Sequence, residues 1–396
     1  MRGSLLLHFL VCGCLVGPNF AHAQSSYAGQ KDLPDIFREW FPKLKPRKTD
    51  STSLNAGQRF VTLIPNIGYT PQSNLLLQTN LNIAFRNPGA NVTVGLLGAT
   101  YTQNNQAILQ GMFNYFSKEN RWFFSSDWRF MHYPQATYGL GMNTDADSTI
   151  SMDYQYLRLY QTAMRRVLPN LYVGVGYELD IHSNIESWNA TRELHRISHY
   201  RYGVQGKSVS SGMSLNVLYD NRTNALNSTQ GFYANLMWRQ NLTLLGSDRS
   251  YRAFQVDMRK YVRLPTHYTN VLAFWGYGVF TNGTPPFLDL PSTGWDTFSN
   301  SGRGFIQGRF RGKSLLYFEV EYRFQISQNQ LFGGVLFTNW QGVSETRTNQ
   351  FTKFVPAFGG GLRIRINKYT RSNLAIDYGI GADGSHNIYF NVGEVF

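Results

Sequence analysis

One stretch in the last third of the chain has the residue types and spacing for ion-pair chemistry. Residues 302–324 read GRGFIQGRFRGKSLLYFEVEYRF, a basic, glycine-rich half followed by a half in which charged side chains alternate with apolar ones. Guanidinium groups form strong, often bidentate hydrogen bonds to carboxylates, so the basic half could bind the acidic half if the chain folded back. The cations of the first half are Arg303, Arg309, Arg311 and Lys313, and the charged residues of the second are Glu319, Glu321 and Arg323.

Residue types that catalyse reactions or bind metals form no comparable group. His195 and His199 have the i, i+4 spacing that could share a metal ion on a helix, but no clear third ligand accompanies them, and polar loop residues are the favoured interpretation. No G-x-S-x-G sequence marks a nucleophile elbow. The sequence therefore predicts a protein that is not an enzyme, with no metal and no cofactor.

The N-terminus predicts that the chain is exported. Arg2 precedes a short apolar run, and the small-x-small sequence AHA at 21–23 follows it, which is the order of a secretory signal peptide over residues 1–23. A lipoprotein signal at Cys14 is the alternative, although the residues before it fit such a signal poorly. Since Cys12 and Cys14 both lie in this segment, the mature chain would have neither a disulfide nor a thiolate site.

Composition favours a membrane-spanning β-barrel over a soluble domain. Charged residues make up 15% of the 396 residues and aromatic residues another 15%, whereas ordinary soluble domains are roughly a quarter charged. No run in the sequence approaches the roughly twenty apolar residues that a transmembrane helix needs. An exported chain of this kind is typical of an outer-membrane barrel.

The net charge of +13 suits anionic partners. Because the chain is predicted to be exported, outer-membrane lipids and lipopolysaccharide are the expected neighbours, and no nucleic-acid partner is predicted. An ordinary basic surface without a specific partner is the alternative.

Residues 24–58 are predicted to form a short periplasmic lead-in to the barrel. They are polar and contain several prolines, and the piece LPDIFREWFPKLKP can form one short amphipathic helix bounded by its prolines. A helix that plugs the barrel is the alternative interpretation.

From residue 59 to 396 the sequence alternates with a period of two. Roughly sixteen segments of about ten to fourteen residues are separated by turn residues, the last of them at 386–396. Most connections on one side are short, whereas three on the other side are long, at 134–148, 183–208 and 282–312. We therefore predict an all-β, sixteen-stranded antiparallel transmembrane barrel over 59–396, closed between its first and last strands, with fourteen or eighteen strands as alternatives.

Several motifs resemble the BamA/TamA superfamily of outer-membrane assembly barrels, also called the bacterial surface antigen family. Residues 303–305, Arg-Gly-Phe, resemble the tip of that family's loop motif, and Gly-Arg-Phe-Arg at 308–311 resembles a branch that reads roughly G-R-Y-R. Residues 63–80, 219–233 and 373–381 resemble the family's first hairpin, its Y-D-x-R…G turn and its closing hairpin. The resemblance covers nearly all of the mature chain.

The resemblance implies sixteen strands and a sixth extracellular loop that folds back into the lumen. Arg303 would then meet polar residues on the inner wall, and the glycines of the loop would allow its tight turns. A solvated extracellular loop with incidental charges is the alternative. The motif residues are Arg303, Gly304, Phe305, Gly308, Arg309 and Arg311, and the candidate partners in the lumen are Glu319, Glu321, Asn339 and Asp377.

Two features depart from the family pattern. The family's partner motif F-x-D-x-G corresponds to FTNWQ at 337–341, so Asn339 accepts a hydrogen bond but brings no charge. The family usually carries periplasmic POTRA domains, and residues 24–58 are too few to form one. A separate periplasmic partner would then supply the missing capture domains.

The resemblance also implies a role in inserting or translocating proteins or lipids through a lateral seam between the first and last strands. Pro65 and Gly393 would weaken that seam, because proline lacks a backbone donor and an interior glycine weakens a strand. Phe396 would form part of the signal that the cell's barrel-assembly machinery reads. A passive pore or a structural surface antigen is the alternative function, and the cargo is left open.

Overall fold

The computed structural model describes residues 29–41, 59–188, 199–265, 269–368 and 371–396. Its described part is one large β-sheet preceded by a short helix. The predicted signal peptide and most of the lead-in lie outside the described residues. The helix is α1 (Leu33–Trp40), and the strands are β1 (Arg59–Thr70), β2 (Asn74–Arg86), β3 (Val92–Thr102), β4 (Ala107–Phe116), β5 (Trp122–His132), β6 (Gln135–Thr137), β7 (Ile150–Leu168), β8 (Leu171–Trp188), β9 (Gly206–Asp220), β10 (Gly231–Asn241), β11 (Tyr251–Arg263), β12 (Val271–Gly283), β13 (Ser314–Gln325), β14 (Phe332–Val343), β15 (Val355–Asn367), β16 (Ser372–Gly381) and β17 (His386–Val392), with 3₁₀ turns η1 (Lys118–Asn120), η2 (Thr243–Leu245) and η3 (Phe287–Asp289).

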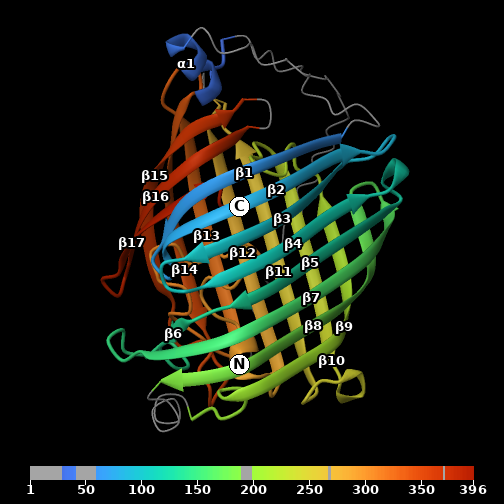
Figure 1. Cartoon of the computed structure of the whole chain (residues 1–396), viewed down its shortest axis with the longest axis vertical. Coiled ribbons are helices and arrows are strands. Elements are labelled where there is room, and N and C mark those ends of the chain that lie inside the picture. The colour runs from blue at the N-terminus through green and yellow to red at the C-terminus, as the bar shows by residue number, and fades with distance from the viewer. Residues whose placement is uncertain (1–28, 42–58, 189–198, 266–268, 369–370) are drawn as a thin grey trace, which may run out of the picture.

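Neighbouring strands along the chain pair antiparallel all the way from β1 to β17. The short β6 pairs with β7 just beyond β5, so these two strands share one position and the wall has 16 strands. Strands β1 and β17 lie side by side and nearly close the barrel (Figure 1). The predicted sixteen-stranded fold is confirmed, but no ladder pair joins β1 to β17 among the described residues.

The side chains of each strand alternate between the outside and the inside of the barrel. In β8, Val173, Val175 and Tyr177 are exposed on the outer face, whereas Glu178 and Asp180 are buried inside. Because successive side chains in a strand point to opposite faces, this pattern gives an apolar outer band and a polar interior, which is the arrangement of a membrane-spanning barrel.

The last strand is shorter than its predicted range of 386–396. It ends at Val392 because Gly393 takes a φ of +107°, a conformation that favours glycine and turns the chain out of the ladder. The Gly393 amide donates to the Asn373 carbonyl at 2.7 Å, and the Glu394 carboxylate binds inside the barrel. Residues 393–396 therefore leave the wall and enter the lumen.

The rim with the long loops differs from the prediction in two further places. Strand β8 continues to Trp188, past the predicted end of the strand at 182, because residues 186–188 pair with the start of β7. The short strand β6 lies inside the connection predicted at 134–148. Both additions extend the wall beyond the predicted strand ends.

Helix α1 lies at the opposite rim, where the turns are short (Figure 1). The Asp32 carboxylate caps the first turn by accepting a hydrogen bond from the Asp35 amide at 3.2 Å. The Asp35 carboxylate in turn accepts a hydrogen bond from the Asp32 amide. Proline at position 34 suits the first turn, where no intrahelical partner is needed for its nitrogen. No described helix is long and apolar enough to cross a membrane.

Candidate functional site in the barrel lumen

The loop of residues 284–313, called loop 6 below, connects β12 to β13 and crosses the interior of the barrel. On one side, the Arg129 guanidinium of β5 donates to the Thr297 carbonyl of the loop at 2.6 Å. On the other side, the Gly304 amide of the loop donates to the Tyr389 hydroxyl of β17 at 2.9 Å. Loop 6 is therefore fixed to strands from both halves of the sheet.

Three carboxylates from two strands converge on the Arg303 guanidinium. Nη1 donates to Asp377 Oδ2 of β16 at 2.7 Å, and Nη2 donates to both Glu319 and Glu321 of β13. The guanidinium carbon lies 3.7 Å from the centre of the Phe337 ring, and Arg303 is only 3% exposed. A buried cation is tolerated only when it is paired and hydrogen-bonded, and the contacts predicted with these three carboxylates are present.

Asn339 binds the loop in a way that differs from the prediction. Its Nδ2 donates to the main-chain carbonyl of Arg303 at 2.8 Å and does not receive a hydrogen bond from the guanidinium. An ionised aspartate could not make this contact, because a carboxylate only accepts hydrogen bonds. The asparagine therefore holds the loop backbone, while Asp377 supplies the charge.

Gly304 is held against the wall where no larger residue fits. Its φ is +102°, and a Cβ at this position would lie 2.7 Å from the Ala357 Cβ. Its carbonyl accepts hydrogen bonds from Ser385 Oγ at 2.6 Å and Asn387 Nδ2 at 2.9 Å. Gly308 also has a positive φ, of +82°. The Arg-Gly pair thus fixes the tip of loop 6 to the last hairpin.

The next residues of the motif bind other parts of the molecule. Phe305 is buried and meets the Phe310 ring edge-on, with ring centres 5.5 Å apart. Arg309 Nε donates to Asp383 Oδ2 at 3.0 Å and Nη1 donates to Thr144 Oγ1 at 2.7 Å. Arg309 therefore joins loop 6 to two other loops of the same rim.

Arg311 and Lys313 do not meet the acidic residues of β13. Arg311 Nη1 donates to main-chain carbonyls within loop 6, at 3.1 Å to Phe287 and 3.3 Å to Leu290. The Lys313 carbonyl accepts a hydrogen bond from Thr281 Oγ1 at 2.7 Å. Among the hydrogen bonds of the described residues, Arg303 is the cation of the basic half that binds the carboxylates of β13.

A second arginine extends the cluster towards the end of the chain. Arg363 Nη1 of β15 donates to Asp377 Oδ1 at 2.5 Å, and its Nε donates to Glu394 Oε2 at 2.8 Å. Glu394 also accepts a hydrogen bond from Asn373 Nδ2 at 2.6 Å. The carboxylate of Asp377 thus binds both Arg303 of loop 6 and Arg363 of β15. Arg363 also binds Glu394, which follows the end of β17.

Phe396 is buried inside the barrel. Its main-chain oxygen accepts a hydrogen bond from Arg323 Nη2 at 2.8 Å, and Arg323 Nε donates to Glu321 Oε2 at 2.6 Å. The Phe396 ring lies 5.2 Å from the Trp275 ring and 6.2 Å from the Tyr261 ring, measured between centres. This aromatic side chain does not face the lipid side of the wall.

A second buried cluster, which the sequence analysis did not single out, anchors the other end of loop 6. Asp289 accepts hydrogen bonds from the hydroxyls of Ser210 and Tyr251, and burial together with the nearby charge of Asp180 raises the pKa of Asp289 to about 7. Asp180 in turn pairs with Arg239 at 2.6 Å. Asp180, Arg239, Tyr251 and Asp289 line a cavity of about 120 Å³. The alternation of β8 placed Asp180 inside, but no sequence signal connected it to Asp289.

The histidine pair is not supported as a metal site. His195 lies outside the described residues, and His199 has a φ of +53°, which is not helical. Within the part of the chain that the structure describes, no three histidine, cysteine or acidic side chains are grouped as metal ligands.

The fold and the lumen define an outer-membrane barrel with an inward-folded loop. Residues 66–396 match the Omp85 superfamily domain. The chain therefore belongs to the Omp85 superfamily and is a β-barrel protein of the bacterial outer membrane. The predicted relationship to outer-membrane assembly barrels is confirmed at this level. No curated protein matches the sequence.

Solved structures with the same fold include three outer-membrane barrels. BamA from Haemophilus ducreyi lacking POTRA domains 1–3 aligns with a TM-score of 0.56 and 15% identity, over 87% of this chain and 76% of that one. CdiB from Acinetobacter baumannii aligns with a TM-score of 0.56 and 12% identity, over 85% and 59%. CdiB from Escherichia coli aligns with a TM-score of 0.55 and 10% identity, over 86% and 68%. These similarities concern the fold of the barrel.

Proposed function

We propose that this protein inserts proteins into the outer membrane, or moves them across it, by opening the seam between β1 and β17 while loop 6 holds the rest of the barrel fixed. Membership of the Omp85 superfamily and the barrel shared with BamA and CdiB support the general role. One observation carries the proposal for the seam. Every other neighbouring pair of strands shares a hydrogen-bonded ladder, whereas β1 and β17 share none among the described residues.

The energetics of the bilayer explain why such a seam is the place to open. Separating two paired strands in hydrocarbon leaves backbone groups unsatisfied, at a cost of several kcal/mol each. Strand β17 has 7 residues against 12 in β1, and Gly393 turns the following residues away from the wall. Pro65 of β1 has no amide hydrogen to donate. Opening at this place breaks fewer hydrogen bonds than opening elsewhere.

The inner cluster supports a rigid wall beside the seam. Arg303 joins loop 6 to β13 and β16. The carboxylate of Asp377 also binds Arg363, and Arg363 in turn binds Glu394. Charge-assisted hydrogen bonds of this kind are stronger than neutral ones, and they hold the strands next to β17 in place. In this proposal β1 moves and the wall from β13 to β16 does not.

The expected partners follow from the same role. Outer-membrane lipids and lipopolysaccharide surround the apolar band, and the cell's barrel-assembly machinery inserts the chain itself. A periplasmic partner with capture domains would deliver unfolded cargo to the rim where the turns are short. The charged groups described in the lumen bind loop 6 and the end of the chain, and we propose no catalytic role for them.

Reconstitution tests the proposal directly. An unfolded eight-stranded outer-membrane barrel is added to phospholipid vesicles that contain this protein, and its folding is followed by heat-modifiable migration on gels. We expect faster folding than in empty vesicles or in vesicles that contain a porin. Equal rates in all three would contradict the role in insertion, whereas a rate increase lost in seam variants would support the seam.

The passive pore is the second candidate function, and loop 6 argues against it. The loop contacts β5 on one side of the lumen and β17 on the other, so it obstructs a wide aqueous channel. Planar-bilayer recordings should therefore show low conductance in the native protein. A large, steady conductance that persists with loop 6 intact would favour the pore.

A further inference from the structure

Helix α1 is fixed to the barrel rim through its polar face. Lys368, in the turn after β15, donates from its ammonium group to Asp35 Oδ2 at 2.7 Å and from its main-chain amide to Asp32 Oδ2 at 3.1 Å. The Lys31 amide donates to the Asn329 carbonyl, in the turn between β13 and β14, at 2.9 Å. Two neighbouring turns therefore hold the start of the helix, and these contacts are at the rim rather than in the lumen.

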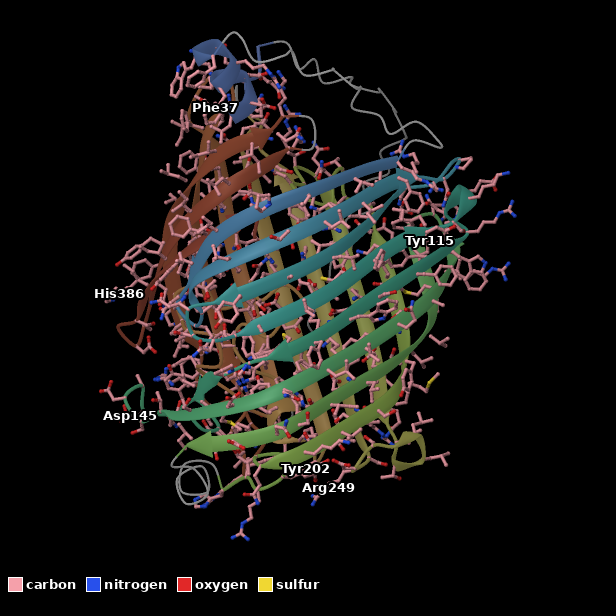
Figure 2. All side chains as sticks on the ribbon, in the orientation of Figure 1. Phe37, Tyr115, Asp145, Tyr202, Arg249 and His386 are labelled. Atoms are coloured by element: carbon pink, nitrogen blue, oxygen red, sulfur yellow. The ribbon has the colours of Figure 1, made fainter. Side chains whose placement is uncertain are left out.

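The opposite face of α1 is apolar and exposed. Phe37, Trp40 and Phe41 are 51%, 70% and 57% exposed. Leu33, Phe37 and Trp40 have the spacing of one helical stripe, and Phe41 follows directly as the residue that caps the C-terminus of the helix. Phe37 lies on the helix where it projects past the strand ends (Figure 2). Exposed aromatic stripes on an otherwise docked helix indicate a binding surface.

Exposed apolar side chains of the barrel flank one of the turns that hold the helix. Ile326 and Phe332, on either side of the turn that carries Asn329, are exposed on the outer wall. By the alternation of β13 and β14 they belong to the band that faces lipid. Helix α1 is therefore attached where that band reaches the rim.

We propose that α1 is an interfacial anchor whose Phe37, Trp40 and Phe41 enter the headgroup region of the phospholipid leaflet at the short-turn rim. Tryptophan and phenylalanine are favoured at this depth, where an aromatic ring is partly apolar and partly hydrated. The charged face of the helix stays bound to the barrel, so the helix lies along the membrane surface instead of crossing it. The partner is the bilayer itself, and in the orientation predicted from the sequence this leaflet faces the periplasm.

Depth-dependent quenching tests the anchor. In the full-length chain with Cys12→Ser and Cys14→Ser, a single cysteine at Phe37→Cys carries an environment-sensitive fluorophore. The protein is reconstituted in vesicles of phosphatidylethanolamine and phosphatidylglycerol that contain lipids with a nitroxide near the headgroup. We expect a blue-shifted emission and quenching several-fold stronger than for the same label at Glu39→Cys, on the charged face of the same helix.

Two results with the single-labelled proteins would overturn the proposal. One is equal quenching at the two positions, which would mean that the aromatic stripe does not enter the leaflet. The other is a label at position 37 that is shielded in whole cells but solvent-exposed in the vesicles, which would indicate a protein partner. A second variant, Trp40→Ser with Phe41→Ser, should keep the heat-modifiable barrel but show reduced quenching at position 37. Unchanged quenching in that variant would also contradict the anchor.

Discussion

Arg303 of loop 6 and Asp377 of β16 form a buried ion pair, with Nη1 of the arginine 2.7 Å from Oδ2 of the aspartate. The other oxygen of the same carboxylate lies 2.5 Å from Nη1 of Arg363. One aspartate therefore links the inward loop to a strand that also binds the end of the chain. This relationship places the loop and the wall beside the seam in a single charged network.

Arg303→Ala should leave Glu319, Glu321 and Asp377 without their shared cation. Removing one member of a buried ion-pair group costs about 3–5 kcal/mol, so we expect a barrel that assembles but unfolds at a lower urea concentration, with a loop open to protease. Urea unfolding in vesicles and limited proteolysis measure both effects. Arg121→Ala is the control, because its exposed ion pair with Glu119 should contribute about 0–1 kcal/mol. Equal losses in the two variants would argue against a special role for Arg303.

Gly304→Ala should loosen the tip of loop 6. The added Cβ would meet the Ala357 Cβ at 2.7 Å in a backbone with φ of +102°, and strain in such a conformation costs about 1–3 kcal/mol. Gly384→Ala has a similar φ of +83° but nothing within 4 Å of the new atom. We expect protease cleavage of loop 6 in the first variant and much less in the second. The same cleavage pattern in both would show that backbone conformation, and not contact with the wall, is responsible.

The stability of loop 6 should depend on pH through Asp289. Because its pKa in the folded protein is raised to about 7 from 3.8, the folded state binds this proton more tightly than the unfolded state. Stability should therefore rise as the pH falls from about 7 towards 4. Asp289→Asn should remove the part of this dependence that comes from residue 289, while keeping a group that can hydrogen-bond to Ser210. Protease cleavage of loop 6 across this pH range measures the effect, and an identical pH profile in both proteins would refute it.

Phe396→Ala should lower the amount of heat-modifiable protein in the outer membrane. We predict that the residue belongs to the signal for the assembly machinery, although its ring is also buried against Trp275. Trp275→Ala is the matched control, since it removes the same contact but keeps the terminal residue. A larger defect in cells for Phe396→Ala, with similar folding of both purified variants in vesicles, would support the signal. Similar defects in cells would assign the effect to packing in the lumen.

Much of the fold could be predicted because a membrane barrel imposes one rule on every strand. The alternation of apolar and charged side chains in 314–324 predicted which residues of β13 face the lumen, including the buried Glu319 and Glu321. The end of β17 could not be predicted in the same way. The predicted range ran to 396, but the contacts of the residues after Gly393 with Arg363 and Arg323 draw them into the lumen.

The site was predictable where both partners lay close in the sequence or on a recognisable strand. Arg303 and the carboxylates of β13 are 16 and 18 residues apart in the sequence, and Asp377 lies on the inner face of its strand. The role of Asn339 depends on where the carbonyl of Arg303 points, which only the folded loop determines. The Asp289 cluster combines residues from β8, β9, β10 and β11, and none of them stands out alone in the sequence.

Locking the seam with a disulfide is the most direct test of the proposed function. In the background without native cysteines, Ile67→Cys on β1 is combined in turn with a cysteine at Ile388, Phe390 or Val392 on β17, all of which are exposed on the outer face. The control is Tyr378→Cys with Ile388→Cys, a directly paired position between β16 and β17. We predict that the oxidised seam lock abolishes the folding of added barrels in vesicles, that reduction restores it, and that the control lock has no effect. A barrel locked between β1 and β17 that still folds its substrate at the native rate would contradict the account.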